Sequence, residues 1–147
     1  RQNLPAVSRS AEQLADIQRG AYVLADRNDA RAVLIASGSE VALALAAQAL
    51  LDAERLPVRV VSMPSSTRFD RQPREWRDQV LPTGLPRFGV EAGVSQFWGH
   101  YGCVAALGID SFGESAPAAD LYRHFEFTAE SLAALVRTHV DNPVTIR

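Results

Sequence analysis

Residues 30–51 constrain the fold of this chain more than any other stretch. Residues 33–36, Val-Leu-Ile-Ala, form a short continuous apolar run, which is typical of a strand buried on both faces of a parallel sheet. The Ser-Gly-Ser turn at 37–39 follows, and residues 40–51 are mostly strong helix formers. A strand, a tight turn and a helix make up the first half of a βαβ unit, so the sequence predicts an α/β fold.

The polar link at residues 26–29 sets the direction of the first strand. It is too short to hold a crossover helix, so the strand before it should run antiparallel to the central strand. Besides the central strand, four strands are predicted, at residues 21–25, 58–64, 87–92 and 108–113. The predicted fold class is a three-layer α/β/α sandwich with a five-stranded mixed, mostly parallel sheet, the first strand antiparallel.

Helix-capping patterns mark the helices between these strands. Ser10 and Gln13 form a capping-box pattern, and Gly20 is the expected end of that first helix. Ser39 is the expected cap of the second helix, where Glu40 also suits the helix dipole. Helices are predicted at residues 10–19, 40–51, 73–81, 114–125 and 128–140, and residues 65–72 are interpreted as an irregular loop.

The composition indicates an ordinary soluble domain. The 147 residues carry a net charge of −2 and one cysteine, so we expect no nucleic acid, no membrane partner and no internal disulfide. The sequence has neither a membrane-spanning apolar run nor a signal peptide, and we expect a cytoplasmic protein. The first residue is not Met, which suggests a piece of a longer protein. Residues 1–9 are interpreted as an interdomain linker, 10–140 as the domain and 141–147 as a tail.

The turn formed by Ser37, Gly38 and Ser39 is a candidate anion or regulatory site. A phosphate commonly binds where a strand meets a helix in a doubly wound sheet. Glu40 would repel a phosphate at that helix start, however, and the segment has neither a G-x-G-x-x-G pattern nor a Walker lysine. The capping role of Ser39 is therefore the preferred interpretation, and anion binding is the second hypothesis.

The histidines and the cysteine do not form a recognisable catalytic or metal-binding set. His100, His124 and His139 lie in separate segments without ligand spacing, so neither a zinc site nor a catalytic triad is expected. His139, in the last turn of its helix, suits the negative end of the helix dipole as a cation. Cys103 lies in an apolar context, which favours an inert core thiol over a nucleophile.

Two carboxylates and an aromatic segment stand where α/β sheets place functional groups. Glu91 lies at the end of one predicted strand and Glu114 follows the last one. They are candidates for joint acid–base work, although backbone hydrogen bonding or helix capping is the favoured interpretation. Residues 97–102 are compatible with a short helix or a packed loop. The cluster of Trp98, His100 and Tyr101 would line a ligand site or form an interface.

Five segments, in the same order and at the same spacing, resemble the C-terminal region of the transketolase family. They are residues 1–5 (Arg-Gln-Asn-Leu-Pro), 36–41 (Ala-Ser-Gly-Ser-Glu-Val), 60–65 (Val-Val-Ser-Met-Pro-Ser), 90–93 (Val-Glu-Ala-Gly) and 112–118 (Phe-Gly-Glu-Ser-Ala-Pro-Ala). The resemblance covers nearly the whole chain, from Arg1 to about Val140. It implies the same three-layer sandwich, with a five-stranded mixed sheet and an antiparallel first strand.

The resemblance also implies the chemistry of a parent enzyme, which transfers a two-carbon ketol unit from a ketose phosphate to an aldose phosphate. Such enzymes are homodimers that need thiamine diphosphate and a divalent cation, Mg²⁺ or Ca²⁺, both bound by upstream domains that this chain lacks. The catalytic residues and metal ligands belong to those domains, so none maps onto this sequence. One substrate contact does map: Arg1 matches an arginine that contacts the sugar phosphate, which suits the two parallel hydrogen bonds of a guanidinium.

The expected role of this chain is structural or dimer-supporting, without catalysis on its own. One alternative is a regulatory α/β domain of a related thiamine diphosphate enzyme, with a small-molecule site at the strand ends near Gly38, Met63 and Gly93. Another is an interaction role, in which the aromatic segment packs on the missing domains or joins subunits. The resemblance does not separate a pentose phosphate pathway role from a Calvin cycle role.

Overall fold

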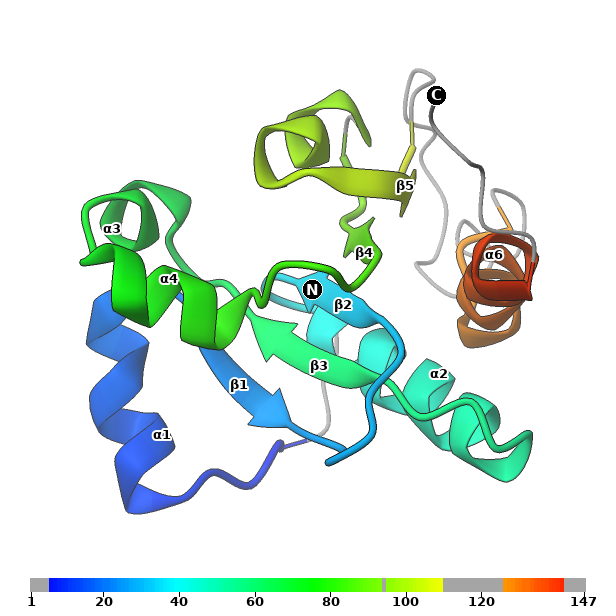
Figure 1. The fold of residues 1–147 in the computed structure, drawn as a ribbon, viewed down its shortest axis with the longest axis horizontal. Coiled ribbons are helices and arrows are strands. Elements are labelled where there is room, and N and C mark those ends of the chain that lie inside the picture. The colour runs from blue at the N-terminus through cyan, green and yellow to red at the C-terminus, as the bar shows by residue number, and fades with distance from the viewer. Residues whose placement is uncertain (1–5, 94, 110–125, 142–147) are drawn as a thin grey trace.

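The computed structural model describes residues 6–93, 95–109 and 126–141, and its five strands form one mixed sheet (Figure 1). The strands are β1 Tyr22–Ala25, β2 Val33–Ala36, β3 Arg59–Ser62, β4 Arg87–Val90 and β5 Cys103–Leu107, in the order β1-β3-β2-β4-β5 across the sheet. β2, β3, β4 and β5 run parallel, whereas β1 pairs antiparallel with β3. This confirms the predicted fold class and the predicted direction of the first strand, whose hydrogen-bonded partner is β3 rather than β2.

Helices cover both faces of this sheet. They are α1 Ala11–Asp16, the 3₁₀ helix η1 Ile17–Arg19, α2 Glu40–Ala53, α3 Ser66–Asp70, α4 Arg74–Val80, the 3₁₀ helix η2 Ser95–Tyr101 and α6 Ala129–Asp141. Side chains of α2 and α6 pack on one face, and side chains of α3, α4 and η2 pack on the other. The helices on these two faces are the outer layers of the predicted sandwich.

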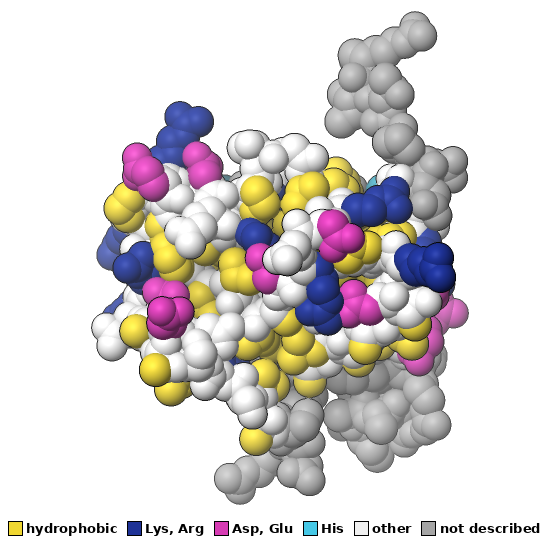
Figure 2. Space-filling model, turned by 60° about the horizontal axis from the view of Figure 1, so that its bottom comes forward, with side chains coloured by type: hydrophobic (Ala, Val, Ile, Leu, Met, Phe, Trp, Pro, Cys, Tyr) yellow, Lys and Arg dark blue, Asp and Glu magenta, His cyan; other side chains and the backbone are white. Residues whose placement is uncertain are grey.

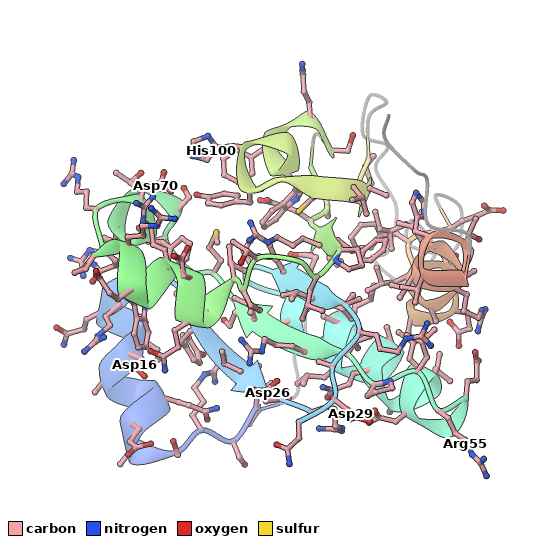
Figure 3. The ribbon with its side chains drawn as sticks, in the orientation of Figure 1. Asp16, Asp26, Asp29, Arg55, Asp70 and His100 are labelled. Carbon is pink, nitrogen blue, oxygen red and sulfur yellow. The ribbon has the colours of Figure 1, made fainter. Side chains whose placement is uncertain are left out.

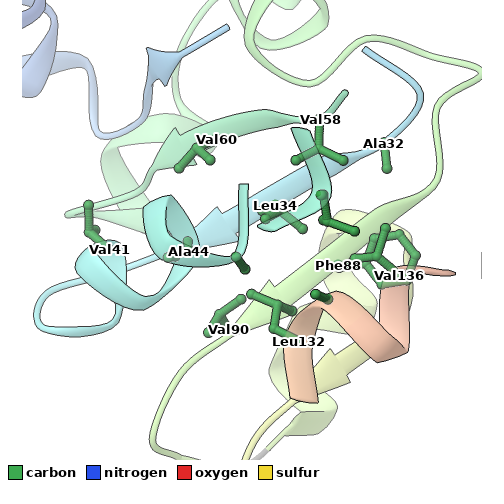
Figure 4. Packing of buried hydrophobic residues seen from close by; sticks show 14 of the residues in the cluster. Ala32, Leu34, Val41, Ala44, Val58, Val60, Phe88, Val90, Leu132 and Val136 are labelled. Carbon is green, nitrogen blue, oxygen red and sulfur yellow. The ribbon is translucent and has the colours of Figure 1, made fainter. Parts of the chain in front are cut away.

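β2 is the centre of the core, and both of its faces are buried. All four residues of Val33–Ala36 are 0% exposed. Successive side chains of a strand point to opposite faces, so Leu34 joins the cluster with α2 and α6 while Ile35 joins the cluster with α3 and α4. Figure 4 shows the first cluster, in which Ala44 of α2 and Leu132 of α6 pack around the strands.

Ion pairs connect the loops at the amino edge of the parallel strands. Arg59, the first residue of β3, donates to the two carboxylate oxygens of Asp26 at 2.9 and 2.7 Å. Asp26 follows β1, which ends at this edge because it runs antiparallel (Figure 3). Arg27 donates through Nε to Asp52 of α2 at 3.0 Å. On the face drawn in Figure 2, acidic and basic side chains are interspersed rather than separated by sign.

The first helix begins and ends as its sequence predicts. The backbone N–H of Gln13 donates to Ser10 Oγ at 3.1 Å, and the N–H of Ser10 donates to Gln13 Oε1 at 3.0 Å, which completes the capping box. Gly20 ends η1 with φ at 90°, in the left-handed region that favours glycine.

Ser39 precedes α2 as predicted, but the expected capping hydrogen bond from the first turn of α2 to its side chain is absent. Its backbone is already helical, with φ −66° and ψ −28°, so its side chain does not reach the N–H groups of the first turn. Its Oγ instead donates to Glu40 Oε1 at 2.7 Å. The N–H of Glu40 donates to the carbonyl of Ser37 at 3.1 Å.

Two predicted segments differ from the structure. The fifth strand is Cys103–Leu107 rather than residues 108–113, of which 108 and 109 lie outside any strand and the rest lie outside the described residues. The predicted loop at 65–72 contains α3, whose N–H at Arg68 donates to Ser65 Oγ.

The segment 97–102, predicted as a short helix or a packed loop, lies largely within η2. The predicted helix at 114–125 lies outside the described residues. The predicted tail at 141–147 begins one residue too early, because Asp141 is the last residue of α6, and residues 142–147 lie outside the described residues.

No helix in the described ranges is long and apolar enough to cross a membrane.

Gly89 of β4 lies against the ring of Trp98, the largest buried side chain in the cluster that contains residues of α3 and α4. A Cβ at Gly89 would lie 2.1 Å from Cγ of Trp98, far inside van der Waals contact. Trp98 itself is 1% exposed, so its ring has no room to retreat. The close contact between β4 and η2 therefore requires glycine at this position.

We predict that Gly89→Ala lowers the free energy of unfolding by about 2 kcal/mol or more, because the added methyl group overpacks the core. Urea denaturation followed by circular dichroism measures the change. Gly99→Ala is the matched control, since a Cβ at Gly99 meets nothing within 4 Å. Equal stability of the two variants would contradict the conclusion that the packing of Trp98 requires glycine at position 89.

Candidate functional site at the carboxyl edge of the sheet

A hollow of about 340 Å³, called here the Trp98 hollow, lies at the carboxyl edge of the sheet. It is lined by Ser37 after β2, by Met63, Pro64, Ser65 and Ser66 after β3, by Glu91 after β4, and by Phe97 and Trp98 of η2. Three neighbouring strands end here, which is where open α/β sheets bind ligands. The structure thus brings two sequence-predicted candidates, Ser37 and Glu91, to one place.

The other two residues of the predicted turn line a different hollow. Gly38 and Ser39 face a space of about 250 Å³ that is shared with Arg9. The Arg9 guanidinium is engaged there, because its Nε donates to the hydroxyl of Tyr22 at 2.6 Å. Anion binding at this turn stays a prediction, and the carboxylate of Glu40, which accepts from Ser39, is the charge that would oppose it.

Two carboxylates come together beside the Trp98 hollow. Burial raises the pKa of Glu91 above its usual value of 4.5, and the negative charge of Glu40 raises it further. Glu40 is only 7% exposed. Because the two charges repel each other, this edge of the sheet favours groups that are neutral or positive over anions.

Trp98 supplies a buried donor at the same place. Its ring packs edge-on against Phe97, with ring centroids 5.3 Å apart and planes at 74°. Its indole Nε1 is buried and has no hydrogen-bond partner. An unpaired buried N–H of this kind costs about 1–3 kcal/mol.

Sequence reasoning found one member of the carboxylate pair but not the other. The sequence offers Glu114 as the partner of Glu91 in the less favoured acid–base hypothesis, and Glu114 lies outside the described residues. The carboxylate that acts on Glu91 is Glu40. The signal was present in the sequence, since the two glutamates follow β2 and β4, which are neighbours in the sheet.

The predicted histidines do not converge. His100 Nε2 lies 3.5 Å from a carboxylate oxygen of Asp70, and both side chains are on the upper left of Figure 3. His139 lies in the other layer, where its Nδ1 is 2.9 Å from the carbonyl of Leu135. His124 is outside the described residues, as is Arg1.

In the part of the chain that the structure describes, we looked for side chains able to bind thiamine diphosphate and its metal ion. There, no group of three or more His, Cys, Asp or Glu side chains lies close enough to hold a metal ion. Glu40 is an acidic residue in the first turn of α2, and its negative charge opposes a diphosphate at that helix start. These residues therefore do not fit thiamine diphosphate and its cation.

We predict that Glu91→Gln raises the melting temperature at pH 7. The pKa of Glu91 is raised on folding, so its ionised form destabilises the native state at neutral pH, and the neutral amide removes that cost. As the pH falls to the unfolded-state value near 4.5 and below, the wild-type carboxyl is protonated too and the difference should vanish.

Differential scanning calorimetry between pH 4 and pH 7 measures this trend. Asp29→Asn, at an exposed turn, is the control that should leave the pH dependence nearly unchanged. A stabilisation by Glu91→Gln that grows as the pH falls would contradict the assignment.

We predict that Cys103 reacts slowly with Ellman's reagent at pH 8. Burial raises the pKa of its thiol to about 12, with Arg87 opposing the shift, so almost no thiolate is present. In guanidinium chloride the unfolded chain should react at the rate of a free cysteine. A fast reaction of the native protein would identify a reactive thiol and contradict the prediction of an inert one.

Comparison with known proteins agrees with this architecture. Residues 20–128 match the family described as Transketolase-like TK C-terminal domain. The plasmid-encoded transketolase of Cupriavidus necator is 49% identical over 146 residues, which covers 97% of this chain and 22% of that protein. The transketolase structure from Leishmania mexicana superposes with a TM-score of 0.88 at 43% identity, covering 95% of this chain and 20% of that one.

A split gene transketolase, solved as an inactive β4 tetramer, superposes with a TM-score of 0.67 at 25% identity and covers 96% of this chain and 48% of that one. The chain spans about a fifth of the length of the curated relative above. The matched residues run from the start of β1 to the start of α6, and so include the whole sheet. On this evidence the chain belongs to the transketolase family, in which it corresponds to the C-terminal domain.

Proposed function

We propose that this chain is the C-terminal part of an enzyme that transfers a two-carbon ketol unit from a ketose phosphate to an aldose phosphate. The observation that carries the proposal is the family match over residues 20–128, together with 49% identity to a transketolase along almost the entire chain. The enzyme works in the pentose phosphate pathway or the Calvin cycle, and it is a cytoplasmic homodimer.

Within that enzyme, this domain has a structural and dimer-supporting role. Thiamine diphosphate and Mg²⁺ or Ca²⁺ bind to the upstream domains and supply the carbanion chemistry there. The paired carboxylates at the carboxyl edge of this sheet argue against diphosphate binding on this domain. The relative described as an inactive β4 tetramer supports the view that this part alone does not catalyse the reaction.

Arg1 is the one residue of this chain for which we propose a substrate contact. Its guanidinium would bind the sugar phosphate through two parallel hydrogen bonds.

A domain exchange tests the proposal. In the Cupriavidus necator enzyme, the segment aligned with this chain is replaced by this chain, and ketol transfer from xylulose 5-phosphate to ribose 5-phosphate is measured with thiamine diphosphate and Mg²⁺. We predict a rate within about tenfold of the unmodified enzyme, or ~1.4 kcal/mol in activation free energy. The isolated 147-residue chain should show no turnover under the same conditions.

The unmodified enzyme truncated before the exchanged segment is the control for a contribution of this domain. Circular dichroism and light scattering establish that the exchanged protein is folded and dimeric. A folded dimer without activity would contradict the assignment to the parent enzyme. Turnover by the isolated chain would contradict the structural role.

A further inference from the structure

A second hollow, of about 470 Å³, lies where α3, α4 and η2 meet, on the face of the sheet opposite α2 and α6. Its volume is within the range of small-molecule sites, and it shares no lining residue with the Trp98 hollow. We call it the Arg77–Arg87 hollow. Its charged and titratable lining residues are Asp70 of α3, Arg74, Arg77 and Asp78 of α4, Arg87 of β4 and His100 of η2.

Arg87 is a cation that the fold holds in place with neutral groups. Its Nη1 donates to the carbonyl of Tyr101 at 2.8 Å, and its Nη2 donates to the carbonyls of Leu81 at 2.8 Å and Pro82 at 3.2 Å. These bonds use three of the five N–H groups of a guanidinium and leave two for another acceptor. No carboxylate in the described ranges forms an ion pair with Arg87, so its positive charge has no counter-ion there.

Arg77 is a second cation at this hollow. The neighbouring Arg74 pairs with Asp78 at 3.2 Å, whereas the exposed side chain of Arg77 has neither a hydrogen bond nor an ion pair with any residue that the structure describes. A free guanidinium offers a planar set of N–H donors that matches the oxygen atoms of a phosphate. The hollow therefore combines one cation that is fixed in place with one that is free to turn toward a ligand.

The two aspartates of the hollow are already engaged. Asp70 accepts from the hydroxyl of Tyr101 at 3.1 Å, and its other oxygen lies 3.5 Å from His100 Nε2 (Figure 3). Burial, with Asp70 adding to it, raises the pKa of Tyr101 to about 12, so this hydroxyl stays a donor to the carboxylate. Asp78 is held by Arg74. Three arginines against two aspartates leave a positive lining even with His100 neutral, which favours an anion.

We propose that the Arg77–Arg87 hollow binds the phosphate group of a small phosphorylated molecule. Arg77 donates to the phosphate from α4, and Arg87 donates to it from β4. A phosphate monoester has three terminal oxygens and up to two negative charges, so it can accept from two guanidinium groups on different sides. The volume of about 470 Å³ leaves room for the rest of a small molecule. This site goes beyond the ketol transfer of the parent enzyme and does not depend on it.

Other ligand classes match these residues less well. A carboxylate has one charge and two oxygens in one plane, so it suits a single guanidinium. A cation would meet Arg77 and Arg87, while the aspartates that could attract it already have partners. A neutral molecule would leave the charges of Arg77 and Arg87 without a counter-ion.

Isothermal titration calorimetry of the 147-residue chain, in Tris chloride with about 20 mM NaCl to limit screening, tests the proposal. The probes are inorganic phosphate and glycerol 3-phosphate. Glycerol is the uncharged counterpart of the second probe, and acetate is the carboxylate. Backbone amide spectra of the ¹⁵N-labelled chain locate the site, because glycerol 3-phosphate should shift amides of α4 and η2 but not those of α2.

Arg77→Gln is the diagnostic variant, since it removes a cation from the hollow without removing a side-chain contact to any described residue. Arg55→Gln is the matched control. It removes the same charge from an exposed arginine just after α2, which lies at the lower right of Figure 3, whereas Asp70 and His100 of the hollow lie at the upper left. Thermal unfolding followed by circular dichroism establishes that both variants fold as the wild type does.

We predict a millimolar Kd for glycerol 3-phosphate and a weakening of about tenfold in Arg77→Gln, the effect of losing a hydrogen bond between charged groups. Arg55→Gln should change the Kd by less than about twofold, because a distant exposed charge is screened. Glycerol and acetate should each bind at least about tenfold more weakly than glycerol 3-phosphate.

Four results would overturn the proposal. The first is the absence of saturable binding of both phosphate probes up to about 50 mM, well above a millimolar Kd. The second is an equal loss of affinity in Arg77→Gln and Arg55→Gln, which would show a general effect of net charge. The third is acetate binding as tight as that of glycerol 3-phosphate. The fourth is a set of amide shifts confined to residues 37–41, which would place the anion at the turn before α2.

Discussion

The burial of β2 between two parallel partners is the constraint on which the rest of the structure depends. Its residues pair with β3 on one side and with β4 on the other, and all four are 0% exposed. In this register Ala36 is opposite both Ser62 and Val90, so the residues that follow the three strands emerge side by side. The Trp98 hollow is a consequence of that alignment, because its walls are the residues just beyond these strand ends.

The sequence predicted those parts of the fold whose signal is local and strong. The apolar run of β2 and the short link after β1 were sufficient for the sheet type and for the antiparallel first strand. β5 was missed because its small apolar residues carry little strand preference and because an edge strand lacks a fully buried pattern, with Val104 50% exposed. α3 was missed because five residues are too few to show a helical period.

The candidate site was predictable by position but not by contact. Ser37 and Glu91 could be placed at neighbouring strand ends from the sequence, because parallel strands share one carboxyl edge. The field of Glu40 at Glu91, and the indole of Trp98 left without an acceptor, depend on side-chain packing that no periodicity encodes. Ser39 shows the same limit. Because its φ and ψ are helical, its side chain donates to Glu40 and does not accept from the N–H groups of the first helical turn.

The two ends of the sheet also differ in their response to ionic strength. At the amino edge, Arg59 with Asp26 and Arg27 with Asp52 are attractive pairs, which dissolved salt weakens. At the carboxyl edge, Glu40 and Glu91 repel, and the same salt relieves that repulsion. Salt therefore weakens the contacts at one end of the sheet and relieves the repulsion at the other, so the two edges respond to ionic strength in opposite directions.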